Sequence, residues 1–94
     1  MAAVGLLTLD LHIPASRSLK DKRQVVKSIV MRLRNRHNVS VAEVDCHDLW
    51  QRCQLGVSAV SGDGRHLNQQ LQRVLQEVEA MHLAELVDYE IEIL

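Results

Sequence analysis

The stretch Cys53-Gln54-Leu55-Gly56-Val57-Ser58-Ala59, followed closely by Ser61-Gly62-Asp63-Gly64, decides the fold. In the first segment, apolar residues alternate with polar or small ones, which is the period-2 pattern of a strand with one buried face. The second segment is a run of turn-forming residues that ends the strand. Asp63 is a favourable residue for capping a helix. The sequence therefore predicts a strand that leads through a short turn into a helix.

Downstream of this turn, the chain continues with a helix and then another strand. Apolar residues at helical spacing predict a helix that runs to Met81. The chain finishes with Tyr89, Ile91 and Ile93 alternating with acidic residues, which predicts a strand over 88–93. The predicted helix stripe consists of Leu67, Leu71, Val74, Leu75, Val78 and Met81.

Upstream, a strand, a helix and a second strand are predicted in that order. Alternating apolar residues from Leu7 to Ile13 predict the first strand, which Pro14 ends. Ser18, with Asp21 three residues on, is a helix start signal, and apolar residues at helical spacing continue to about position 36. The β-branched segment 39–44 predicts the second strand, although its residues do not reveal which face is buried. A charged turn at 45–48 joins it to the third strand as an antiparallel hairpin.

The order β-α-β-β-α-β indicates a ferredoxin-like α+β domain that spans residues 1–94. We expect a two-layer sandwich in which an antiparallel four-stranded sheet carries both helices on one face. The first and third strands should lie centrally, with the fourth beside the first and the second beside the third. We expect the other sheet face to be polar, and acidic where the fourth strand lies beside the first. Its expected residues are Thr8, Asp10, His12, Arg52, Gln54, Gly56, Ser58, Asp88, Glu90 and Glu92.

Composition indicates a globular chain with a strongly uneven distribution of charge. Apolar residues make up 47% of the sequence, and no apolar run approaches the ~20 residues that span a bilayer. The N-terminal segment does not resemble a signal peptide, so we expect a cytoplasmic protein without membrane partners. The formal net charge is −1, yet eight of the eleven Lys and Arg residues lie between Arg17 and Arg36. The last eighteen residues contain six acidic residues and neither Lys nor Arg.

Three motifs carry a resemblance to a known family. They are Ser18–Arg23, Asn38–Val44 and Asp48–Arg52, and they follow a leading strand that ends in Ile13-Pro14. In this order they resemble the YlxP-like family, a domain of unknown function (DUF503), over nearly the whole chain. The resemblance implies a ferredoxin-like fold in a cytoplasmic bacterial protein. The family's genes often neighbour those for translation initiation and ribosome-binding factor A, which implies a role near the ribosome.

The first predicted helix presents cations on one face. At 100° per residue they fall within a narrow sector beside the apolar stripe, and one more cation precedes the helix cap. Such a strip can neutralise phosphates, and the helix N-terminus can add N–H groups for an anion. We therefore predict contact with structured RNA or the ribosome; the alternatives are a solvated face or pairing with Glu77 and Glu79 of the second helix. We call this set the basic ridge: Arg17, Lys20, Arg23, Lys27 and Arg34.

The alternative function is a protein-interaction or homo-oligomerisation module. Trp50, the only Trp, is either a packing residue or an interface anchor, and the outer strands leave open sheet edges. An enzyme is not expected, because Cys46 and His47 are sequence neighbours that point apart, and no glycine-rich phosphate loop is present. Two thiols without Cys-x-x-Cys spacing do not predict a metal site, and no cofactor is expected.

Overall fold

A computed structural model describes residues 1–94, and it has the predicted order of elements. Both helices and all four strands lie where the sequence patterns place them, although the first and fourth strands begin three or four residues earlier than predicted. Neither helix is long and apolar enough to cross a membrane. The elements are β1 (Ala3–His12), α1 (Leu19–Arg36), β2 (Ser40–Asp45), β3 (Arg52–Ser61), α2 (Gly64–Met81) and β4 (Glu85–Ile93).

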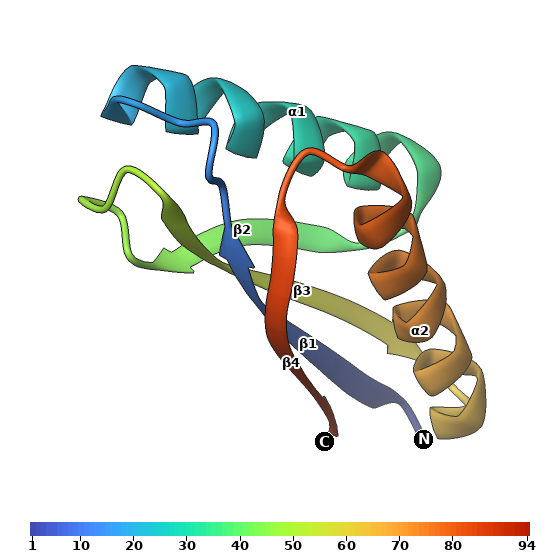
Figure 1. The fold of residues 1–94 in the computed structure, drawn as a ribbon. Coiled ribbons are helices and arrows are strands. Elements are labelled where there is room, and N and C mark those ends of the chain that lie inside the picture. Colours follow the sequence, from blue (N-terminus) through green and yellow to red (C-terminus); the bar gives the residue numbers. More distant parts are fainter.

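The strands form one antiparallel sheet in the order β2-β3-β1-β4, and both helices cover the same face (Figure 1). This confirms the ferredoxin-like α+β fold, with β1 and β3 at the centre. The central pair runs in register from Ala3 opposite Ser61 to His12 opposite Arg52. The chain ends lie at the same end of the molecule, because Leu94 and Val4 exchange backbone hydrogen bonds.

Side-chain caps fix where the two helices begin. The Ser18 hydroxyl accepts a hydrogen bond from the backbone N–H of Asp21 at 3.0 Å, and the Asp21 carboxylate accepts one from the N–H of Arg17 at 3.1 Å. Asp63 caps α2 by accepting from the N–H of Arg65 at 2.9 Å. These bonds satisfy N–H groups that have no partner within a helix, and they confirm both predicted start signals.

The core is aliphatic and lies between the sheet and the helices. Leu9 and Leu55 face each other across the central strand pair, and Leu71 of α2 belongs to the same core; all three are fully buried. Gly5 lets α2 approach β1 closely, because a Cβ built there would lie 2.8 Å from Leu71 Cδ1. The core is therefore a layer rich in leucine, and the chain contains no Phe.

The structure shows which face of β2 is buried, and it places a β-bulge near the end of the strand. Val41 is buried against the helices, opposite Val57, but the pairing with β3 shifts register between Glu43 and Asp45. The extra residue, Val44, then lies over Gly56 on the open face of the sheet, where a Cβ at Gly56 would be 3.1 Å from Val44 Cγ1.

The prediction of a uniformly polar open face is wrong for the half of the sheet near β2. Leu6 and Val44 flank Gly56 there, and Val4 and Val60 are also partly exposed. The period-2 pattern of β1 and β3 identified the buried face correctly. It did not exclude apolar residues at the alternate positions, because an exposed Val or Leu is compatible with a folded surface.

Candidate nucleic-acid interface

Helix α1 buries one stripe of side chains against the sheet. The buried residues are Lys22, Val26, Ile29 and Leu33, which recur every three or four positions. At 100° per residue, the basic ridge is centred ~120° around the helix from this stripe. All five ridge residues are exposed. The ridge therefore lies on a water-facing flank of α1, as the sequence predicts.

Contacts at the C-terminal end of α1 show which flank this is. Arg36 and His37 lie 3.6 Å and 3.4 Å from the Glu77 carboxylate, so that side of α1 faces α2. On the other side, Arg34 Nη2 donates a hydrogen bond to the Val41 carbonyl of β2 at 2.7 Å. Arg34 thus reaches the outer edge of β2, and the ridge lies on the flank of α1 that faces away from α2.

Carboxylates do not neutralise the ridge. None of its five cations lies within 4 Å of an Asp or Glu oxygen. The pairing considered from the sequence does occur for Glu77, but its partners are Arg36 and His37. Arg34 is the one ridge member with a tertiary contact, and its guanidinium keeps further donors beyond the single bond to Val41.

The N-terminus of α1 has fewer free backbone N–H groups for binding an anion than the sequence suggests. The backbone N–H groups of Arg17 and Asp21 are already taken by the Asp21 and Ser18 side chains. Anion binding at this end would therefore rely on the side chains of Arg17 and Lys20 more than on free backbone donors.

Another cation of α1, Lys22, is buried, and its burial was not predicted from the sequence. Its ammonium lies 2.7 Å from Glu43 Oε2 and donates to the carbonyls of Cys46 and His47. It therefore ties the start of α1 to the loop between β2 and β3. Helical spacing could have predicted this burial, because Lys22 is in phase with the apolar stripe through Val26 and Ile29.

The loop between β2 and β3 presents two large apolar side chains, Leu49 and Trp50, to solvent. Trp50 is 56% exposed, so it does not lie in the core. It precedes β3, which begins at Arg52. Cys53 is buried as expected, and burial, together with the nearby Glu43 carboxylate, raises its thiol pKa to about 12. Such a thiol is protonated and unreactive at neutral pH.

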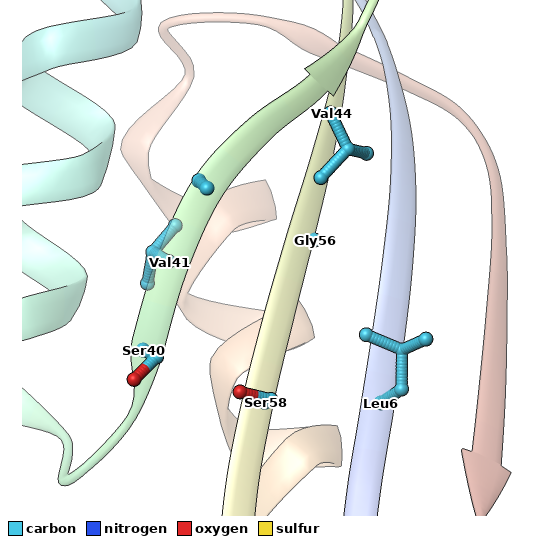
Figure 2. Close-up of a pocket in the computed structure, with 7 residues that line it drawn as sticks. Leu6, Ser40, Val41, Val44, Gly56 and Ser58 are labelled. Atoms are coloured by element: carbon cyan, nitrogen blue, oxygen red, sulfur yellow. The ribbon is translucent and has the colours of Figure 1, made fainter.

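The open face of the sheet carries a shallow apolar groove at its β2 side. Figure 2 shows Val44 of β2 and Leu6 of β1 near Gly56, which has no side chain to fill the space between them. Ser40 and Ser58 close one end of the groove. Because its walls are apolar and it contains no cation, the groove does not suit a nucleic-acid phosphate.

Comparisons with known proteins agree with the fold and identify the family. A designed protein, "De novo designed protein Foldit4", superposes with a TM-score of 0.58 at 14% identity, covering 100% of this chain and 97% of its own; this likeness concerns the fold alone. "Uncharacterized protein YlxP" of Bacillus subtilis is 38% identical over 77 residues, which are 82% of this chain and 84% of that protein. The family described as "Protein of unknown function (DUF503)" matches residues 4–91. Because this family matches nearly the whole chain and the Bacillus subtilis protein is 38% identical to it, the chain belongs to the DUF503 family.

Proposed function

We propose that this protein is a non-enzymatic binding protein that contacts structured RNA through the basic ridge of α1. One observation carries the proposal: four exposed cations share one flank of α1, Arg17 adds a fifth just before the helix cap, and none of the five is paired with a carboxylate. Like charges three or four residues apart repel each other on a helix surface. A phosphate backbone relieves this repulsion and releases its own counterions.

The charge on the rest of the surface favours binding by the helix layer over binding by the sheet. Asp88, Glu90 and Glu92 of β4 lie on the open face, and the aromatic residues do not: Trp50 is in a loop, and Tyr89 points to the helix side beside Leu9. Single strands need aromatic platforms for their bases. The expected target is therefore a folded RNA that is recognised by its phosphates and shape.

Ribosomal RNA is the first candidate for this target. The family resemblance implies gene neighbours in translation, and ribosomal RNA is the abundant structured RNA of a bacterial cytoplasm. The acidic β4 side of the protein would be repelled by RNA, which helps to orient the ridge toward it. Such a partner would place the protein in the cytoplasm.

Cosedimentation with purified ribosomal subunits tests the proposal. The wild-type protein should pellet with subunits at low salt and be released at high salt. The triple variant Lys20→Glu, Arg23→Glu, Lys27→Glu should stay in the supernatant. A matched control, Arg52→Glu, Arg65→Glu, Arg73→Glu, makes the same change in net charge at exposed cations outside α1 and should still pellet. Equal loss in both variants, or no pelleting by the wild type, would refute a role for the ridge.

A second function, protein interaction, is supported by a different observation. Trp50 exposes 56% of its surface, and large exposed aromatic residues often anchor interfaces. If Trp50 anchors a protein partner, the protein–protein association should persist at high salt and after nuclease treatment. Trp50→Ala should abolish it. If RNA is the partner, Trp50→Ala should leave binding unchanged.

A further inference from the structure

The two outer strands of the sheet differ in how their free edges are protected. At the β2 edge, the Val41 carbonyl accepts a hydrogen bond from Arg34 at 2.7 Å, and the Glu43 carbonyl bonds to His47 Nε2 at 3.1 Å. These carbonyls are two residues apart, so both point in the same direction, away from β3 at the free edge of the sheet. Side chains therefore already occupy the acceptors that an incoming strand would need.

At the β4 edge, most outward backbone groups have no such partner. Because Leu94 and Val4 form a hydrogen-bonded pair, the alternation of the ladder directs the N–H and C=O groups of Tyr89, Ile91 and Ile93 away from β1. The Tyr89 N–H bonds to its neighbour Asp88 at 2.8 Å. No side chain bonds to the three carbonyls or to the other two N–H groups. An extended segment could therefore pair with β4 from Tyr89 to Ile93.

The helix layer also leaves the apolar side chains of this edge partly uncovered. Tyr89 and Ile93 are 47% and 42% exposed, although they lie on the face that the helices cover elsewhere. Ile91 between them is half-buried. A fifth strand with apolar residues on this face would extend the core over these three side chains.

The opposite face of β4 selects the charge of the incoming strand. Asp88, Glu90 and Glu92 point to the open face, and none has a cation within 4 Å. Glu90 and Glu92 stand at positions where the outer pairing would be non-hydrogen-bonded, so cross-strand side chains would come closest there. Lys or Arg opposite them would be favoured, and an acid would be repelled.

This arrangement disfavours pairing between two copies of β4. A ladder must match outward residues with outward residues, so Tyr89, Ile91 and Ile93 would face one another in any antiparallel register. The acids would then necessarily face acids, Glu90 opposite Glu92 of the second copy for example. Like charges directly opposite destabilise a strand pair.

We propose that β4 receives an extended segment of another protein, in which apolar residues alternate with Lys or Arg, as a fifth strand of the sheet. Main-chain hydrogen bonds would provide affinity, and the acids of the open face would provide specificity. The surface is separate from the basic ridge, and the proposal does not depend on RNA binding.

Three fluorescent peptides of about seven residues test the proposal by anisotropy. One alternates Lys with Val, one alternates Glu with Val, and one has the Lys composition but proline at two Val positions, which prevents strand pairing. Only the Lys–Val peptide should bind. In the protein variant Glu90→Lys, Glu92→Lys, this binding should weaken by about tenfold or more, and the Glu–Val peptide should begin to bind. Amide hydrogen exchange at Ile91 and Ile93 should slow when the Lys–Val peptide binds.

The variant Ile93→Pro checks the pairing mode. The Ile93 N–H points outward, so proline removes a donor for the new strand and leaves the ladder to β1 intact. It should abolish peptide binding, while the circular dichroism spectrum should keep its native form. Equal binding of the proline-containing peptide would show charge attraction alone and overturn the proposal. It would also be overturned by failure of the Lys–Val peptide to bind, or by a dimer that protects Ile91 and Ile93 without peptide.

Discussion

Lys22 Nζ lies 2.7 Å from Glu43 Oε2, and only 1% of the lysine side chain is exposed. The same ammonium donates to two carbonyls of the loop between β2 and β3. A charge in such a place is tolerated only when it is paired and hydrogen-bonded. The contact joins the first turn of α1, where the basic ridge begins, to the β2–β3 hairpin, whose loop contains Trp50.

Removing one partner of this pair should be more harmful than neutralising both. Lys22→Met leaves the Glu43 carboxylate and two loop carbonyls without their donor, so we expect a loss of about 3–5 kcal/mol in the free energy of unfolding. The double variant Lys22→Met, Glu43→Gln removes the uncompensated charge and should recover part of that loss. Urea unfolding measures both. A double variant less stable than Lys22→Met would contradict this account of the pair.

Arg34 should affect stability more than its ridge neighbour Lys27. Arg34→Ala removes the hydrogen bond to the Val41 carbonyl, and we expect it to cost about 1 kcal/mol. Lys27→Ala removes an exposed side chain without a partner and should change stability by less than about 0.5 kcal/mol. Thermal unfolding of the two variants checks the difference. Equal effects would mean that the Arg34 bond does not contribute in solution.

Two glycines in neighbouring strands should respond oppositely to alanine. At Gly5 the new methyl would meet Leu71, which is fully buried and has no room to move, so we expect a cost of about 1–3 kcal/mol. At Gly56 it would meet Val44, which is 52% exposed and can rotate away. Gly56→Ala should therefore be neutral or stabilise the strand by up to about 1 kcal/mol. Chemical denaturation of both variants gives the sign of each effect.

The buried Cys53 thiol should make stability fall at high pH. Burial raises its pKa from 9.0 to about 12, so the folded state keeps the proton over a range in which the unfolded state loses it. The stabilisation is complete below about pH 9 and is lost as the pH rises toward 12. The stability of the wild type relative to Cys53→Ala should therefore decrease as the pH rises from about 9 toward 12. A constant difference over this range would contradict the burial of the thiol.

The sequence predicted the fold because its strongest patterns are local. The alternation from Leu7 to Ile13, the Ser18 and Asp63 caps and the turn at 61–64 each favour one kind of element. Together they leave few topologies for a chain of this length. Sheet order then follows from the handedness of the crossovers. The structure confirms this part of the analysis.

The parts that the sequence did not predict depend on contacts between elements. The phase of β2 depends on which of its apolar residues pack against the helices, and the segment shows no local signal for this choice. The burial of Lys22 depends on acceptors that the loop after β2 brings to it. The basic ridge was found because its cations lie on one helix, so helical spacing alone brings them together. The sequence could not show whether the ridge cations pair with Glu77. The structure shows that Glu77 pairs with Arg36 and His37 instead.

The salt dependence of binding to a structured RNA tests the central claim most directly. If the ridge neutralises phosphates, a plot of log K against log salt concentration should be linear, with a slope of about −0.9 for each phosphate contacted on a duplex. We predict that Lys20→Glu, Arg23→Glu, Lys27→Glu flattens this slope, whereas Arg52→Glu, Arg65→Glu, Arg73→Glu changes it little. The claim would be contradicted if the wild type and the ridge variant had equal slopes. It would also be contradicted if the control variant flattened the slope more than the ridge variant does.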